Sequence, residues 1–143
     1  MSRAPLGRDW LAANLPHQGA MCLLDAIVDW SDAGLRAVAQ GHRSNANPLR
    51  RGAELPVTAA IEYAAQAAAA HGALLASRPS GAGMLVAVRG VEFHARRLDD
   101  LAGALDVAVE PLGGGDSGVI YRFEVSSAGR PLASGRLTVA FAR

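Results

Sequence analysis

The sequence of 143 residues contains one cysteine, Cys22, and no lysine; all 14 basic side chains are arginine. A single cysteine excludes an internal disulfide and a zinc site built on several cysteines. The net charge is only +1, which excludes a strongly cationic nucleic-acid-binding protein and an acidic disordered tail. Half of the residues are apolar, and this fraction is sufficient for one hydrophobic core.

Long hydrophobic runs are also absent. No apolar run reaches about 18 residues without a charged or strongly polar interruption, so we expect no membrane span. Residues 1–17 lack the continuous apolar stretch of a secretion signal. No two histidines have the H-x-x-x-H spacing of a metal site, and neither a nucleotide-binding loop nor a G-x-S-x-G motif is present. We therefore expect one cytoplasmic domain, residues 1–143, without a metal.

The middle of the sequence predicts one long helix, and both flanks predict strands. Residues 57–76 are helix formers, apolar on nearly every face, and Pro56 stands at their start. Residues 21–30 and 35–41 predict a hairpin with a turn between them. Further strands are expected at 84–97, 105–111, 119–125 and 132–142.

This order predicts an α+β fold in which an antiparallel sheet of five or six strands wraps one long central helix. An open sheet edge would favour dimerisation by edge pairing. Three local features are also predicted: an N-cap at Asp9, a bulge at Gly90 and a turn at residues 113–118.

Glu62 is the most informative residue, because it lies inside the apolar helix. A carboxylate there is costly unless it is paired or faces a cavity. Thr58 and Gln66 lie four residues before and after it and share its face, so the three predict a functional polar stripe. The alternative interpretation is an exposed helix face, or a hydrogen bond to the backbone.

Each of the four histidines by itself is more often structural than catalytic. His71 follows Glu62 by two and a half turns and points to the other side of the helix. His94 is expected to face outward from a strand. His17 and His42 carry more weight, because both lie near chain turns around the helix entrance.

Two groups of residues resemble the β-hydroxyacyl-[acyl carrier protein] dehydratases. Leu15-Pro16-His17 followed by Leu23-Leu24-Asp25 is similar to the L-P-H…L-L-D opening of that family. Leu55-Pro56 followed by Ile61-Glu62-Tyr63-Ala64-Ala65-Gln66-Ala67 is similar to the family's helix, P-G…I-E-A-M-A-Q. With Asn47-Pro48-Leu49-Arg50, the chain resembles in particular the small dehydratase-like subunit of aryl polyene biosynthesis clusters. The resemblance implies the hotdog fold.

The resemblance also implies an activity, namely dehydration of 3-hydroxyacyl thioesters on acyl carrier protein to trans-2-enoyl thioesters, in fatty-acid-like or aryl polyene synthesis. Such a reaction needs no cofactor. A carboxylic acid in an apolar site suits protonation of the leaving hydroxyl, which we assign to Glu62. A neutral imidazole suits removal of the C2 proton.

The base departs from the family pattern. The family carries its catalytic histidine in H-F-P-G, about fourteen residues before the glutamate, whereas this stretch reads Asn47 to Gly52 without histidine. We therefore assign the base to His17, and expect Asn47 to hold substrate or water through its amide. Backbone N–H groups at the helix start would bind the thioester oxygen. The predicted substrate-binding set is Asn47, Gln66, His42, Pro56 and Val57.

The implied partners are an acidic acyl carrier protein and a second hotdog chain, in a homodimer or a heterodimer, with no nucleic acid. Two arginine pairs are candidates for the carrier-docking patch, although solvated surface pairs are the alternative. They are Arg50, Arg51, Arg96 and Arg97. Two other functions stay open: a hotdog thioesterase, in which Glu62 activates water without a histidine, and a non-catalytic partner subunit of a related dehydratase.

Overall fold

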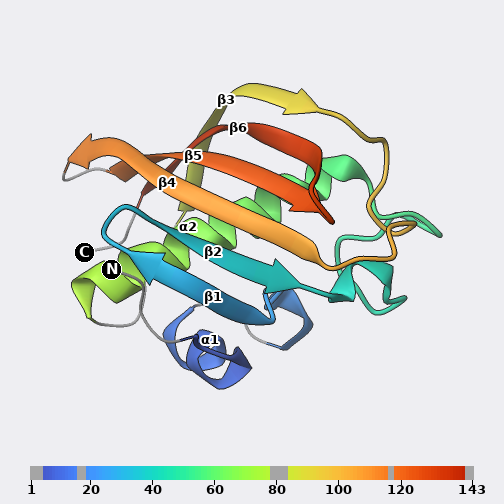
Figure 1. Cartoon of the computed structure of the whole chain (residues 1–143), viewed down its shortest axis with the longest axis horizontal. Coiled ribbons are helices and arrows are strands. Elements are labelled where there is room, and N and C mark those ends of the chain that lie inside the picture. The colour runs from blue at the N-terminus through green and yellow to red at the C-terminus, as the bar shows by residue number, and fades with distance from the viewer. Residues whose placement is uncertain (1–4, 16–18, 78–83, 116–117, 141–143) are drawn as a thin grey trace.

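The computed structural model describes residues 5–15, 19–77, 84–115 and 118–140. A 17-residue helix, α2 (Ala60–Ala76), lies behind an antiparallel sheet whose strands cross in front of it in Figure 1. A short 3-10 turn, η3 (Val57–Ala59), leads into α2, and Pro56 precedes it as predicted. The short helix α1 (Arg8–Asn14) packs against α2.

The described strands form one six-stranded sheet in the order β1-β2-β4-β5-β6-β3. Their bounds are β1 Ala26–Ser31, β2 Gly34–Ala39, β3 Met84–Phe93, β4 Leu105–Gly115, β5 Gly118–Ser127 and β6 Arg130–Ala140. Every neighbouring pair is antiparallel. One long helix against such a sheet is the hotdog architecture, so the predicted fold class is confirmed.

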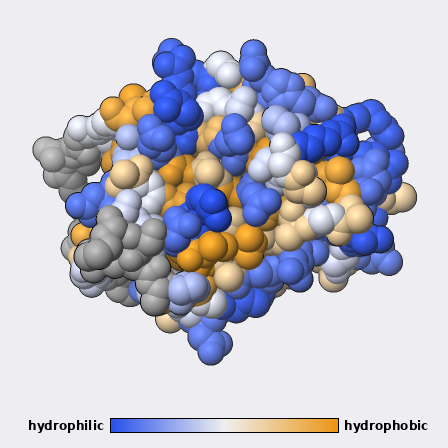
Figure 2. Space-filling model, viewed as in Figure 1, coloured by the Kyte–Doolittle hydropathy of each residue, from blue (hydrophilic) through white to orange (hydrophobic). Residues whose placement is uncertain are grey.

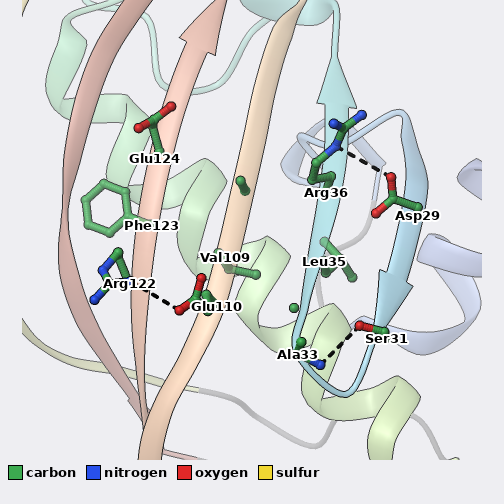
Figure 3. Close-up of a pocket in the computed structure, with 12 residues that line it drawn as sticks. Asp29, Ser31, Ala33, Leu35, Arg36, Val109, Glu110, Arg122, Phe123 and Glu124 are labelled. Carbon is green, nitrogen blue, oxygen red and sulfur yellow. Dashed lines mark hydrogen bonds and ion pairs between the residues drawn. The ribbon is translucent and has the colours of Figure 1, made fainter. Parts of the chain in front are cut away.

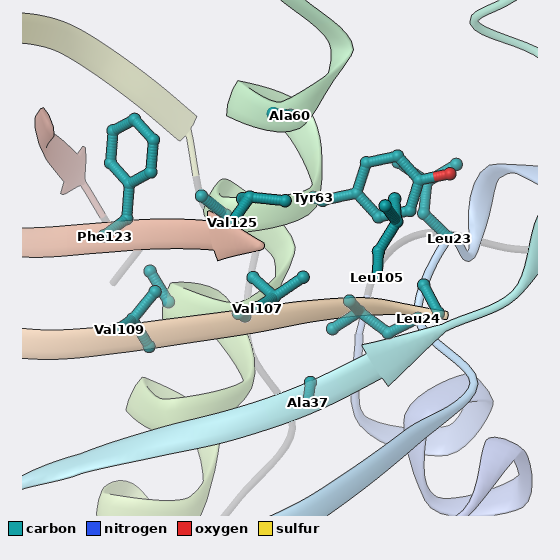
Figure 4. Packing of buried hydrophobic residues seen from close by; sticks show 14 of the residues in the cluster. Leu23, Leu24, Ala37, Ala60, Tyr63, Leu105, Val107, Val109, Phe123 and Val125 are labelled. Carbon is teal, nitrogen blue, oxygen red and sulfur yellow. The ribbon is translucent and has the colours of Figure 1, made fainter. Parts of the chain in front are cut away.

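The core lies between α2 and the inner face of the sheet. The strands alternate as predicted: in β2, Leu35 and Ala37 are buried and Arg36 between them is exposed. On α2 the facing positions are alanines, including Ala64 and Ala68, which lets the sheet approach the helix closely. Figure 4 shows side chains from β4 and β5 packed beside the helix in this layer.

The predicted hairpin and the bulge at Gly90 are confirmed. Strands β1 and β2 pair up to Ser31 and Gly34, which leaves Asp32 and Ala33 as the turn. Gly90 has a φ of 60°, and the register between β3 and β6 shifts between Arg89 and Glu92. Glycine adopts this left-handed φ without the steric strain that a side chain would cause, which suits a bulge in the edge strand β3.

Several predicted boundaries are wrong. Strand β1 begins at Ala26 and not at residue 21, because residues 19–21 form a 3-10 turn. Strand β3 ends at Phe93 rather than at residue 97. Helix α1 begins at Arg8 with Gly7 at its N-cap, so Asp9 is not the cap. Asp9 lies instead in the first turn, where a carboxylate favours the helix dipole.

The glycine tract that suggested a turn belongs mainly to a strand. Gly113, Gly114 and Gly115 continue β4 and pair with residues 118–120 of β5. A Cβ added to Gly114 would lie 2.5 Å from the carbonyl oxygen of Gly118. The close approach of the two strands therefore requires glycine here. Residues 116–117 of the expected turn lie outside the described residues.

Candidate functional site

Glu62 lies on the first turn of α2 and is exposed, as is Thr58 one turn before it. Ile61 and Ala65 beside them are half-buried. This face of the helix is turned away from the four strands that α2 contacts most, β2, β4, β5 and β6. For the chain alone, the expectation of a desolvated carboxylate is therefore wrong, and the alternative of an exposed helix face describes it.

Gln66 does not share the exposed face of Glu62. Its side chain is 2% exposed; Nε2 donates to the Met21 carbonyl oxygen at 2.6 Å, and Oε1 accepts from the Leu23 N–H at 2.9 Å. Four residues turn the helix by about 40° beyond a full circle, which here carries the side chain into the core. The predicted polar stripe is therefore broken at Gln66, which anchors the segment before β1.

Asn47 is buried, and its amide is fully used inside the protein. Nδ2 donates to the Gly41 carbonyl oxygen at 3.1 Å and to the Tyr63 hydroxyl oxygen at 2.9 Å. Oδ1 accepts from the Leu49 N–H at 2.9 Å. These contacts use both amide hydrogens and hold the oxygen, so in this structure Asn47 offers little to a substrate. The sequence pattern did not reveal Tyr63 as its partner, because the two lie 16 residues apart.

His42 follows β2 in a 3-10 turn and is 2% exposed. Its Nε2 lies 2.9 Å from the Leu101 carbonyl oxygen, which can only accept, so Nε2 carries the hydrogen. Nδ1 is buried, and none of the described residues forms a hydrogen bond with it. The burial of the ring separates His42 from the exposed face of Glu62. His94 is exposed as predicted.

The helix entrance is clamped by a second chain segment. The Val57 N–H donates to the Arg96 carbonyl oxygen at 3.0 Å, so it is not the free donor that the sequence suggested. The Ala59 N–H donates to the Pro56 carbonyl oxygen at 3.0 Å. Among the described residues, the N–H of Thr58 makes no backbone hydrogen bond in this turn.

The two arginine pairs meet at this entrance, and most of their charge is engaged. Arg96 and Arg97 both contact Glu54, at 2.9 and 3.1 Å. A hydrogen bond from Arg97 holds the pKa of Asp99 well below its usual range. Asp99 also accepts from the Leu55 N–H at 2.8 Å.

Within the described residues, Arg50 binds main-chain oxygens. Its guanidinium donates to the carbonyls of Arg43, Ser44 and Ala53 at 3.4, 3.2 and 2.6 Å. Arg50 therefore closes the loop between β2 and α2 on itself. Arg51 is exposed.

A buried histidine that the sequence analysis left aside joins three elements. His71 of α2 places Nε2 2.8 Å from the Ser31 carbonyl oxygen, and Nδ1 3.0 Å from the Tyr121 hydroxyl of β5. Because the carbonyl only accepts, Nδ1 must accept from the Tyr121 hydroxyl. Burial lowers the pKa of His71, against the opposing effects of the Ser31 hydrogen bond and Asp32, and raises that of Tyr121 to about 12.

We predict that acid destabilises the fold through His71. The pKa of His71 in the fold lies below its ordinary value of 6.5, so the unfolded chain binds the proton more tightly. The free energy of unfolding is therefore highest at pH values above 6.5 and decreases as the pH falls below 6.5. Urea unfolding at about pH 7.5 and about pH 5.5 measures this. The His71→Gln variant is expected to flatten the decrease; an equally steep decrease in that variant would exclude His71 as its source.

Two hollows on the described part of the surface are not lined by Glu62. Figure 2 shows apolar surface among hydrophilic residues on the outer face of the sheet. A depression of about 430 Å³ there is crossed by two ion pairs, Arg36 with Asp29 and Arg122 with Glu110 (Figure 3). A second hollow of about 190 Å³ lies beside Asn47.

Among the described residues, no three histidine, cysteine or acidic side chains converge on a metal site, and no helix is long and apolar enough to cross a membrane. His17 lies outside the described residues.

Comparison with known proteins gives a family and a fold. The model of the ApeP-like family, ApeP dehydratase, matches residues 10–142. A chain of the dehydratase heterocomplex ApeI:P from Xenorhabdus doucetiae is 24% identical, with a TM-score of 0.82 over 93% of this chain and 91% of that one. A search of curated proteins finds no match.

Two structures described as thioesterases have the same fold. A mutant thioesterase from Pseudomonas aeruginosa is 17% identical, with a TM-score of 0.57 over 81% of this chain and 79% of that one. A hypothetical thioesterase solved with coenzyme A, from Streptococcus pneumoniae, is 13% identical, with a TM-score of 0.54 over 81% and 84% of the two chains. At these identities the likeness shows the hotdog fold alone.

Proposed function

The chain belongs to the ApeP-like dehydratase family, whose model matches residues 10–142, and we propose that it takes part in dehydrating 3-hydroxyacyl thioesters to trans-2-enoyl thioesters. The family match is the observation that carries this proposal. The exposed Glu62 on the first turn of α2 supplies a carboxyl group for the reaction. The acyl chain would arrive on an acyl carrier protein, in fatty-acid-like or aryl polyene synthesis.

The reaction removes a proton and a hydroxyl group from neighbouring carbons. A base takes the proton from C2, the C–O bond at C3 breaks as the C2=C3 double bond forms, and Glu62 donates a proton so that the hydroxyl leaves as water. The thioester oxygen gains negative charge during proton removal. We propose that the N–H of Thr58, at the positive end of the helix and without a backbone partner in the described turn, donates to it.

A proton donor at Glu62 works best when it is covered. Exclusion of solvent from the Glu62 side chain disfavours the ionised carboxylate and keeps the proton on the acid. In the chain alone Glu62 is exposed, so a second chain over this face would provide the apolar surroundings. We propose that the partner is another hotdog chain, as the heterocomplex of the similar structure suggests. It would pair along β3, an edge strand of the sheet, and cover the exposed face of α2.

We predict that the chain forms an assembly of two or more chains. Its own mass is 14.7 kDa. Light scattering at micromolar concentration is measured on the chain alone and on the chain co-expressed with a second hotdog dehydratase. At least one of the two preparations is expected to give twice that mass or more. Ala65→Arg on the exposed helix face should separate the chains, because it blocks close approach. Ala108→Arg, which adds the same side chain to the outer sheet face, should not. A mass of 14.7 kDa in both preparations would contradict the proposal.

The base stays assigned to His17. We predict that His17→Ala loses single-turnover dehydration by a factor of about 10² or more, since a general base contributes about that much. His42→Ala should lower stability instead, because its buried ring tethers Leu101. A fully active His17→Ala enzyme would remove His17 from the role. A catalytic loss confined to His42→Ala, without loss of stability, would move the base to His42.

Carrier docking is proposed for the more exposed members of the arginine set. Arg51 is exposed, and the Arg96 side chain is 72% exposed although it contacts Glu54. Arg50 and Arg97 are engaged in holding the loops. An acidic carrier would therefore meet Arg51 and Arg96 beside the entrance of α2.

A further inference from the structure

The first turn of α2 has backbone ties but no side-chain cap. The Val57 N–H before it donates to the Arg96 carbonyl oxygen, and the Ala60 N–H donates back to the carbonyl oxygens of η3. Neither η3 nor α2 begins with a capping side chain that hydrogen-bonds to the helix, so a cap does not fix the orientation of this turn. This turn carries Glu62, so its orientation decides where the carboxyl group points.

The side chain of Tyr63 anchors the first turn of α2 in the core. It follows Glu62 directly, so the two side chains leave the helix about 100° apart. Glu62 is exposed, whereas Tyr63 is fully buried. Figure 4 shows the Tyr63 ring beside Leu23 and Leu105, with its hydroxyl at the end away from the helix. A long, packed ring of this kind resists rotation of the turn about the helix axis.

The Tyr63 hydroxyl is held by a side chain whose orientation is fixed. Asn47 Oδ1 must accept from the Leu49 N–H, and Nδ2 must donate to the Gly41 carbonyl oxygen, so the amide cannot flip. The second hydrogen of Nδ2 is thereby directed at the Tyr63 oxygen, 2.9 Å away. Burial raises the pKa of Tyr63, which keeps the hydroxyl neutral.

The loop that carries Asn47 is stiff for other reasons. Arg50 clamps three of its carbonyl oxygens. Arg51 and Glu54 exchange two backbone hydrogen bonds, at 2.7 and 3.2 Å. The loop therefore keeps its shape without the Asn47–Tyr63 contact, and can act as a fixed reference for the helix.

We propose that Asn47 and Tyr63 are positioning residues, which set the direction of Glu62 by locking the first turn of α2 to the loop between β2 and α2. This inference rests on the proposed function of Glu62. Neither residue is assigned to the substrate: both amide hydrogens of Asn47 are used, its oxygen already accepts from the Leu49 N–H, and Tyr63 is buried. The position that the sequence suggested for substrate binding thus serves the site from within the core.

The test uses the assembled complex and four variants. Tyr63→Phe keeps the ring and removes only the oxygen. Asn47→Ala removes the amide that donates to the Tyr63 oxygen, while Arg50 and the Arg51–Glu54 pair still hold the loop. Tyr121→Phe is the matched control, because it removes the other buried tyrosine hydroxyl that binds α2, through His71. Glu62→Gln reports on the proposed function itself.

Tyr63→Phe and Asn47→Ala are expected to lower kcat for dehydration by about tenfold or more while KM stays near the wild-type value, because a small misplacement of a reacting group is costly. Tyr121→Phe is expected to lose about as much thermal stability as Tyr63→Phe and to keep the wild-type kcat. Wild-type kcat in Tyr63→Phe, or an equal loss in Tyr121→Phe, overturns the positioning role while Glu62 keeps its function. No dehydration by the wild-type complex, or full activity of Glu62→Gln, overturns the proposed function together with the positioning role.

Discussion

Replacing Glu62 by glutamine is expected to abolish dehydration and to leave the fold and the assembly intact. Glutamine has nearly the same size and can still form hydrogen bonds, but it cannot supply a proton to the leaving hydroxyl. The side chain is exposed in the chain, so the substitution disturbs no internal contact. A positioned general acid contributes roughly 10²–10⁴-fold, and a loss of that size is predicted in single-turnover formation of the enoyl thioester.

The matched control is Glu124→Gln on the outer face of the sheet, which is also exposed. It makes the same chemical change away from the helix and should keep the wild-type rate. Turnover of Glu62→Gln within about tenfold of the wild type would remove Glu62 from the acid role, because it falls below the contribution of a general acid. A rise in thermal stability alongside the loss of activity would show that the carboxylate is kept for function at a cost to the fold.

Gln66→Ala is expected to have the largest effect on stability. The substitution leaves the buried Leu23 N–H and the part-buried Met21 carbonyl oxygen without their partner. Each unsatisfied buried group costs about 1–3 kcal/mol, and the lost side chain adds a cavity. We predict a decrease of about 2–4 kcal/mol in the free energy of unfolding.

Urea unfolding measures this decrease, with Gln40→Ala as the control. Gln40 is exposed, and its N–H binds Asp25 through the backbone, so loss of its side chain should change the free energy by less than about 0.5 kcal/mol. Equal stability of the two variants would contradict the anchoring role of Gln66. A raised KM without loss of stability would instead restore Gln66 to the substrate-binding role that the sequence suggested.

The elements that depend on local pattern were predictable from the sequence. The helix after Pro56 was found because some twenty helix formers follow one another, and the hairpin because alternation flanks a short turn. Gly90 was identified as a bulge because one glycine interrupts a long strand pattern. The same reasoning failed at Gly113–Gly115, because glycine serves both in turns and where two strands approach too closely for a Cβ.

The site was harder to predict, because its contacts join distant parts of the chain. Glu62 and Gln66 share a helical spacing, but only the packing of the sheet decides that one is exposed and the other buried. Asn47 looked like a substrate ligand because its amide can both donate and accept. Its partners, Gly41, Leu49 and Tyr63, became apparent only once the loop was folded. His71 and Tyr121 lie 50 residues apart, and no sequence spacing links them.

The central claim is that this chain serves a dehydratase, and one assay on the assembled complex tests it most directly. A 3-hydroxyacyl thioester is supplied on acyl carrier protein, and the formation of enoyl thioester and of free thiol is followed in the same reaction. We expect enoyl thioester to form at a rate that depends on Glu62, without release of free thiol. Release of free thiol without enoyl thioester would contradict it and would identify a thioesterase, in which the helix carboxylate activates water.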